Sequence, residues 1–96
     1  MECIELGYAR IITGEDGKVE YAEDIYYPDE RVQYFLEEVG LSFYLDDMKF
    51  KENSEILIVF KYEEMVYTNY FGTEYDENID IVHEQILDEN IWDEEE

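Results

Sequence analysis

The chain is organised around one uninterrupted apolar run, Ile56–Phe60. The run is too short for a helix of its own and is rich in β-branched and aromatic residues, which favours a strand. Because no polar residue alternates within it, we expect a central strand that is covered on both faces. Glu63 and Glu64 then interrupt the pattern, and Met65–Phe71 resumes it with large side chains. This later segment is therefore predicted to be the hairpin partner of the run.

An N-terminal hairpin is predicted before this run. Residues 2–13 and 18–27 both alternate between apolar and polar side chains, and Gly14-Glu15-Asp16-Gly17 between them is a strong turn signal. The side chains expected to share a side are Ile4, Leu6, Tyr8 and Ile12 in the first segment, and Val19, Tyr21, Ile25 and Tyr27 in the second. The other side of the second segment would carry Glu20, Ala22, Asp24 and Tyr26.

The clearest helix signal begins at Pro28, which suits a first helical turn, with acidic residues directly after it. An apolar stripe follows at helical spacing, and Gly40 is the expected C-terminal stop. The stripe consists of Val32, Phe35, Leu36 and Val39. Residues 42–50 are ambiguous, because Phe43, Tyr44 and Leu45 favour a strand whereas Asp46 and Asp47 favour a bulge or turn.

A second helix is predicted from Asn78, which is a good N-cap residue. Ile79, Val82 and Ile86 would lie on one face of it. The predicted order is β-β-α-β-β-β-α. This is an α+β fold with an antiparallel sheet of four to five strands and two helices packed on one face. We expect a single domain over residues 1–96, in which residues 93–96 form a frayed tail.

The charge balance is the outstanding feature of the composition. The 96 residues include 28 Asp and Glu but only 6 Lys and Arg, a formal net charge of −22. Such a charge repels itself and destabilises the compact state, so it needs an explanation beyond solubility. Adaptation to high salt is one explanation. However, abundant Ile, Tyr and Asn suggest an AT-rich genome with accessible lysine codons, which makes the scarcity of lysine look selected.

The sign of the charge also restricts the partners. A net-acidic chain is repelled by nucleic acid and by anionic lipid, so we expect no direct nucleic-acid or membrane binding. The expected partner is a basic protein. The single cysteine, Cys3, forms no internal disulfide, and neither a signal peptide nor a membrane-spanning segment is recognisable. A cytoplasmic protein is therefore expected.

No motif predicts catalysis, a cofactor or a metal site. Residues 14–18 resemble a phosphate loop only superficially, because the required spacing and the following Ser or Thr are absent. Adjacent acids such as Asp46 and Asp47 do not match a calcium loop. His83 is the only histidine and Cys3 the only cysteine, so the chain lacks the residues for a Cys/His zinc set. A Ser-His-Asp triad would have no histidine other than His83 to use. We interpret His83 as a surface or half-buried residue, and Cys3 as a small buried one.

The acids are more informative as a set. Residues two apart on one face of a strand are separated by roughly 6.5–7 Å, and residues four apart on a helix by about 6 Å. Both distances are close to the spacing of neighbouring phosphates. Glu20 with Asp24 and Glu84 with Asp88 would supply such steps. The remaining acids predicted to face a partner are Glu37, Glu38, Asp46, Asp47, Glu63, Glu64, Glu74, Asp76 and Glu77.

In size, charge, aromatic content and α+β composition the chain resembles the small phage-encoded DNA-mimic inhibitors of the anti-CRISPR and anti-restriction type. The resemblance implies an inhibitor, not an enzyme. It would occupy the basic channel of a nuclease or CRISPR effector in the host cytoplasm, as a monomer or homodimer. Exposed tyrosines would act as anchors between arginine side chains. The candidate anchors are Tyr67, Tyr70 and Tyr75, with Tyr62 as a further possibility.

Two other readings remain open. An immunity protein or antitoxin that neutralises a basic toxic nuclease is also small and acidic, but it needs only one acidic patch. A chaperone for a basic protein would bind that protein in the absence of DNA. Acids in unfavourable places, such as Glu37 and Glu38 at the end of the first helix, fit a functional surface. An acidic sequence also produces such placements by chance.

Overall fold

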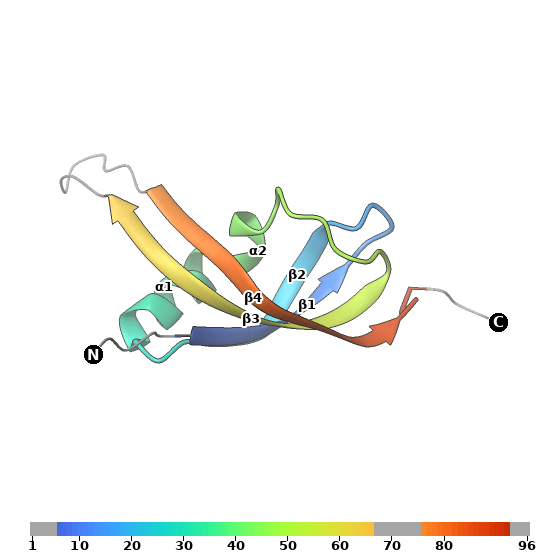
Figure 1. The fold of residues 1–96 in the computed structure, drawn as a ribbon, viewed down its shortest axis with the longest axis horizontal. Coiled ribbons are helices and arrows are strands. Elements are labelled where there is room, and N and C mark those ends of the chain that lie inside the picture. The colour runs from blue at the N-terminus through green and yellow to red at the C-terminus, as the bar shows by residue number, and fades with distance from the viewer. Residues whose placement is uncertain (1–5, 67–75, 93–96) are drawn as a thin grey trace.

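The computed structural model describes residues 6–66 and 76–92, of which residues 39, 63–66 and 76–78 are described by their backbone alone. The elements are β1 (Leu6–Thr13), β2 (Val19–Tyr26), α1 (Glu30–Val39), α2 (Leu41–Tyr44), β3 (Ser54–Val66) and β4 (Asp76–Glu89). Within the described residues the strands form one antiparallel sheet in the order β2-β1-β3-β4 (Figure 1). The predicted α+β class, with a four-stranded antiparallel sheet and two helices, is confirmed. The order β-β-α-α-β-β differs from the predicted one.

The predicted N-terminal hairpin forms as β1 and β2. The Gly14 N–H donates to the Lys18 carbonyl at 3.0 Å, and the Gly17 N–H donates to the Gly14 carbonyl at 3.1 Å. Gly17 has a φ of 80°, a conformation that favours glycine. The turn signal in the sequence therefore has the conformation that its glycines suggest.

The hydrophobic core lies between one face of the sheet and the helical segment. Ile11, Ile56, Ile58 and Phe60 contribute fully buried side chains from β1 and β3. The facing side chains come from the segment that connects β2 to β3, and they are Leu36, Leu41 and Leu45. Since β2 and β3 lie on opposite sides of β1, this connection crosses the sheet and covers one of its faces.

The opposite face of the sheet, called the open face below, carries the other set of alternating side chains. Leu6, Tyr8 and Ile12 share this side, as the sequence predicts, and Ile4 lies outside the described residues. Leu57 and Val59 are only half-buried on it. The prediction that the Ile56–Phe60 run is covered on both faces is therefore wrong: β3 is a central strand with one covered and one open face.

The alternation predicted for β2 is interrupted by two β-bulges. The pairing with β1 shifts between Tyr8 and Arg10 and again between Ile12 and Thr13. Each shift adds one residue to β2 and reverses which side the following side chains face. Consequently Val19, Ile25 and Tyr27 share the core side as predicted. The prediction is wrong for Tyr21, which is exposed, and for Ala22, which packs towards the core.

Helix α1 ends at Gly40 as predicted, but it begins at Glu30, after the predicted start at Pro28. Asp29 is the N-cap and accepts a hydrogen bond from the Arg31 backbone N–H at 2.9 Å, so Pro28 precedes the helix. Gly40, with a φ of 102°, ends the helix and donates its N–H to the Leu36 carbonyl at 2.9 Å. From the predicted stripe, Leu36 is fully buried and Val32 packs against the core.

The segments on either side of β3 depart from the prediction. Residues 42–50 contain no strand; the short helix α2 occupies the start of this segment, and a turn follows it. Strand β3 does not end at Glu63 and Glu64 but continues to Val66, and its hairpin partner is β4. The predicted partner strand Met65–Phe71 is therefore wrong where it is described, and residues 67–71 lie outside the described part.

The predicted second helix is instead the long strand β4, which runs beside β3 (Figure 1). The pairing shifts between Val59 and Phe60 and between Glu55 and Ile56, which leaves Val82 and Leu87 as extra residues on β4. These two bulges place apolar residues three and four apart, so the sequence imitates the spacing of a helix. His83 is exposed on this strand, opposite Val59.

Candidate acidic interaction surface

The acidic side chains divide into two groups by burial. Among the acids whose side chains are described, only Glu23, Asp29 and Glu55 are partly buried, and all others are exposed. Each of the three partly buried acids pairs with an arginine. Among the exposed acids of the described part, only Asp24 does so. Most of the negative charge on the described side chains therefore faces solvent without a cationic side chain beside it.

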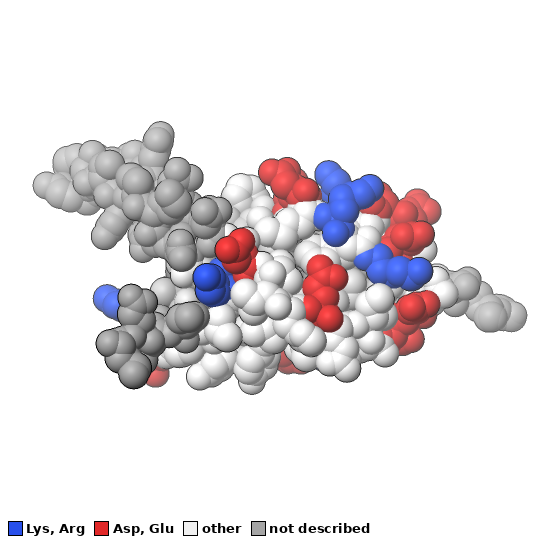
Figure 2. Space-filling model, in the orientation of Figure 1, with Lys and Arg blue, Asp and Glu red and all other residues white. Residues whose placement is uncertain are grey.

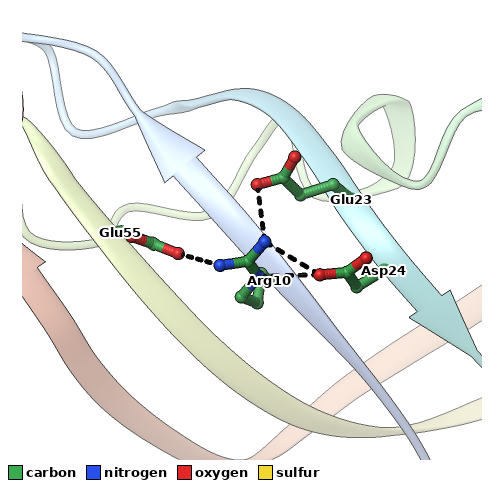
Figure 3. Close-up of polar contacts among 4 residues, drawn as sticks. All are labelled: Arg10, Glu23, Asp24 and Glu55. Carbon is green, nitrogen blue, oxygen red and sulfur yellow. Dashed lines mark hydrogen bonds and ion pairs between the residues drawn. The ribbon is translucent and has the colours of Figure 1, made fainter.

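A concentrated ion-pair cluster surrounds Arg10 on the open face (Figure 3). Its guanidinium lies 2.5 Å from Glu55, 2.9 Å from Asp24 and 3.2 Å from Glu23. Desolvation acts to lower the pKa of Arg10, but Asp24, Glu23 and Glu55 together raise it above its usual value. One positive group holds three negative ones, so the cluster is itself net acidic.

Asp24 occupies an unusual backbone position within this cluster. Its φ is 55°, which is the left-handed region, and it lies at the bulge between Glu23 and Tyr26. Aspartate tolerates this conformation better than most residues. The Arg10 Nε donates to its carboxylate at 2.9 Å, so the bulge is fixed by an arginine from the neighbouring strand. The predicted same-face step from Glu20 to Asp24 is disrupted by this bulge.

The second predicted step also fails to form. In β4, Glu84 lies opposite Ile58 and Asp88 lies opposite Glu55. Side chains directly opposite share a face, so Glu84 faces the helix side and Asp88 the open side. On the face that Figure 2 presents, the acidic groups form separate patches among uncharged and basic groups. The acids thus supply charge density, not a ladder with phosphate spacing along these segments.

The predicted partner-facing residues differ in how far the structure describes them. Those with described side chains are exposed, and they are Glu20, Asp24, Glu37, Glu38, Asp46, Asp47, Glu84 and Asp88. Four others, Glu63, Glu64, Asp76 and Glu77, lie within β3 and β4, where the backbone alone is described. Glu74 and the predicted anchors Tyr67, Tyr70 and Tyr75 lie outside the described residues.

Tyr62 is the only candidate aromatic anchor whose side chain is described, and it is partly buried. Tyr62 packs against the core, with ring contacts to Tyr27 and Phe35. In contrast, Tyr8 and Tyr26 stack on the open face with ring centroids 5.0 Å apart, and they remain 47% and 42% exposed. Their exposure follows from strand parity and the bulge at Asp24.

Sequence reasoning missed a polar network at the far end of the sheet. The fully buried Thr13 hydroxyl donates to the Lys51 carbonyl at 2.6 Å and accepts from the Ser54 N–H at 2.9 Å. The indole N–H of Trp92 donates to the Thr13 carbonyl. This network joins β1, the start of β3 and the segment after β4. No sequence pattern around Thr13, Ser54 or Trp92 indicates this network.

Among the described residues, no group of three or more His, Cys, Asp or Glu side chains is arranged to hold a metal ion. No helix within the described ranges has the length and apolar character needed to cross a membrane.

Comparison of the chain with protein-family models, with curated proteins and with solved structures gave no match.

Proposed function

We propose that this chain is an acidic DNA-mimic inhibitor that occupies the basic nucleic-acid-binding channel of a host defence or DNA-processing protein. A CRISPR effector or a restriction nuclease is the favoured target, and the inhibitor blocks DNA binding by filling the channel. The observation that supports the proposal best is the large set of exposed, unpaired carboxylates on a scaffold with a fully packed core.

The cost of this arrangement supports the proposal. A net charge of −22 opposes folding through self-repulsion, and only two arginines of the described part offset it locally. Charge of one sign accelerates association with an oppositely charged groove and raises its dependence on salt. We therefore propose mimicry of the charge density of a nucleic acid, without a residue-by-residue match to its phosphates.

Competition for DNA is the direct test. A panel of purified CRISPR effectors and restriction nucleases is bound to fluorescently labelled duplex DNA, and the anisotropy is followed as the chain is added. We expect displacement of DNA from at least one member, with an affinity that falls steeply as salt rises. A variant with Glu37→Gln, Glu38→Gln, Asp46→Asn and Asp47→Asn should compete less well. Failure to displace DNA from any member would overturn the proposal.

The immunity-protein alternative gives a different result in the same assay. An immunity protein would abolish cleavage by one toxic nuclease, and binding could leave the occupancy of DNA unchanged. The exposed acids of the described part lie on the β1–β2 turn, on β2, on α1, after α2, before β3 and along β4, instead of in one patch. This distribution favours mimicry over a single acidic patch.

A further inference from the structure

A shallow pocket lies at the end of the sheet, where the β1–β2 turn meets the segment that follows β4. It has a volume of about 260 Å³, and its lining residues are Gly14, Glu15, Glu20, Asn53 and Trp92. These residues come from three segments that are far apart in the sequence. The pocket is therefore a product of the tertiary fold, and no local motif encodes it.

Backbone hydrogen bonds fix the three segments relative to one another. The Asn53 N–H donates to the Gly14 carbonyl at 2.9 Å, and the Ile91 N–H donates to the Asn53 carbonyl at 2.9 Å. The Trp92 indole N–H donates to the carbonyl of Thr13, which is fully buried. Because the indole is held through its N–H, its orientation beside the turn is set before any ligand arrives.

The chemistry of the lining is that of a cation site. Glu15 and Glu20 are exposed and form no ion pair with a described residue. A Cβ added to Gly14 would lie 2.4 Å from the Glu20 Oε2, so the carboxylate of Glu20 occupies the space that a side chain at Gly14 would need. An indole ring next to two carboxylates attracts a positive group through its π face and through charge.

We propose that this pocket binds the guanidinium group of an arginine side chain presented by a basic partner. A guanidinium is planar, stacks on an indole and offers several N–H donors to carboxylates, whereas an ammonium is a compact, strongly hydrated charge. The inference rests on the proposed function, because the channel of a nucleic-acid-binding protein supplies such arginines. It assigns one defined anchor point to an otherwise diffuse acidic surface.

Trp92 makes the test direct, because it is the only tryptophan of the chain. A capped peptide with three arginines is titrated against the full chain at low salt, and tryptophan emission is recorded. The matched probe is the same peptide with three lysines. We expect saturable changes in emission with the arginine peptide and at least about fivefold weaker binding of the lysine peptide.

Variants separate the pocket from the general attraction of a polyanion. Glu20→Gln should weaken binding of the arginine peptide by about tenfold, as expected for loss of one charge-assisted hydrogen bond. Glu30→Gln removes the same charge from an exposed site at the start of α1, away from the acids proposed to face the partner, and should change the affinity by less than about twofold. Gly14→Ala displaces the Glu20 carboxylate without changing the net charge and should also weaken binding.

Three results would overturn the inference: equal affinity for the two peptides, equal effects of Glu20→Gln and Glu30→Gln, or binding without a change in Trp92 emission. The peptide assay contains no nuclease, so it stands independently of the proposed inhibition. If DNA displacement fails while the peptide results hold, the proposed function alone is wrong. If Glu20→Gln leaves the peptide affinity intact while DNA is displaced, the inference alone is wrong.

Discussion

At Gly7, β1 passes close to the aromatic part of the core. A Cβ at this position would lie 2.5 Å from the Tyr26 carbonyl oxygen, 2.5 Å from the Tyr27 ring and 2.9 Å from the Phe60 ring. Tyr26 is fixed by its pairing with Tyr8, so its carbonyl has little freedom to move. We expect Gly7→Ala to lower the free energy of unfolding by about 1–3 kcal/mol, as overpacking does.

Urea denaturation of two variants checks this expectation. Gly14→Ala is the matched control, because the nearest atom to its added Cβ belongs to the flexible carboxylate of Glu20. It should remain close to the unsubstituted chain in stability. If Gly7→Ala lowered the free energy of unfolding no more than Gly14→Ala does, the contact with the Tyr26 carbonyl would be relieved without cost.

The N-cap Asp29 gives a pH-dependent contribution at the same scale. Hydrogen bonds from the Arg31 side chain and then from the Arg31 backbone N–H lower its pKa below the usual 3.8. A carboxyl group with a lowered pKa stabilises the fold above its unfolded pKa, and this contribution disappears as the pH falls through the folded value. Asp29→Asn keeps a capping oxygen but removes the titration.

The difference in unfolding free energy between the unsubstituted chain and Asp29→Asn should therefore be largest at neutral pH. It should shrink as the pH is lowered below about 4. Urea denaturation at several pH values measures this difference. A constant difference over that range would mean that the charge of Asp29 contributes nothing beyond the cap itself.

At the scale of elements, Leu36 is the fully buried side chain that α1 contributes to the core among its described side chains. Leu36 is fully buried among the strands, whereas Tyr34 on the same helix is 64% exposed. Leu36→Ala should lower the free energy of unfolding by about 2–5 kcal/mol, because it leaves a cavity. Tyr34→Ala should change it by no more than about 0.5 kcal/mol. Equilibrium denaturation compares the two, and similar losses would contradict the assigned helix face.

The elements also differ in how far the sequence predicts them. Helix α1 carries its own signals, since Pro28 and the acids after it lie at its start, Gly40 ends it and the apolar spacing marks its buried face. Strand β4 does not, because the bulges at Val82 and Leu87 replace strict alternation by spacings of three and four. Apolar periodicity identifies an element only while its pairing is regular, so each bulge removes that information.

In the candidate site, too, the sequence predicts what depends on local residues and does not predict what depends on strand pairing. The exposure of most predicted acids is a local consequence of their charge, so composition suffices to predict it. Their arrangement depends on strand register, so the expected ladder along Glu84 and Asp88 does not form. The Trp92 contact with Thr13 joins residues 79 apart in the sequence. No pattern within one segment contains a contact of that range.

At the scale of the whole molecule, the charge of −22 determines how stability responds to salt. Screening reduces the repulsion among exposed carboxylates, and it also weakens ion pairs. Among the described residues the pairs involve only Arg10 and Arg31, so screening removes much repulsion and little attraction. We expect the melting temperature to rise with ionic strength, in contrast to a protein stabilised by surface ion pairs.

Thermal denaturation from about 10 mM to about 1 M NaCl spans screening lengths of about 30 Å to about 3 Å. We expect a rise of at least about 4 °C, which corresponds to about 1 kcal/mol for a domain of this size. Tetramethylammonium chloride should give a similar rise, because screening depends on ionic strength and not on a bound sodium ion. A flat or falling melting temperature would mean that repulsion among the carboxylates is not what limits stability. The charge would then impose no cost on the fold, and the support that this cost lends to the proposed function would be lost.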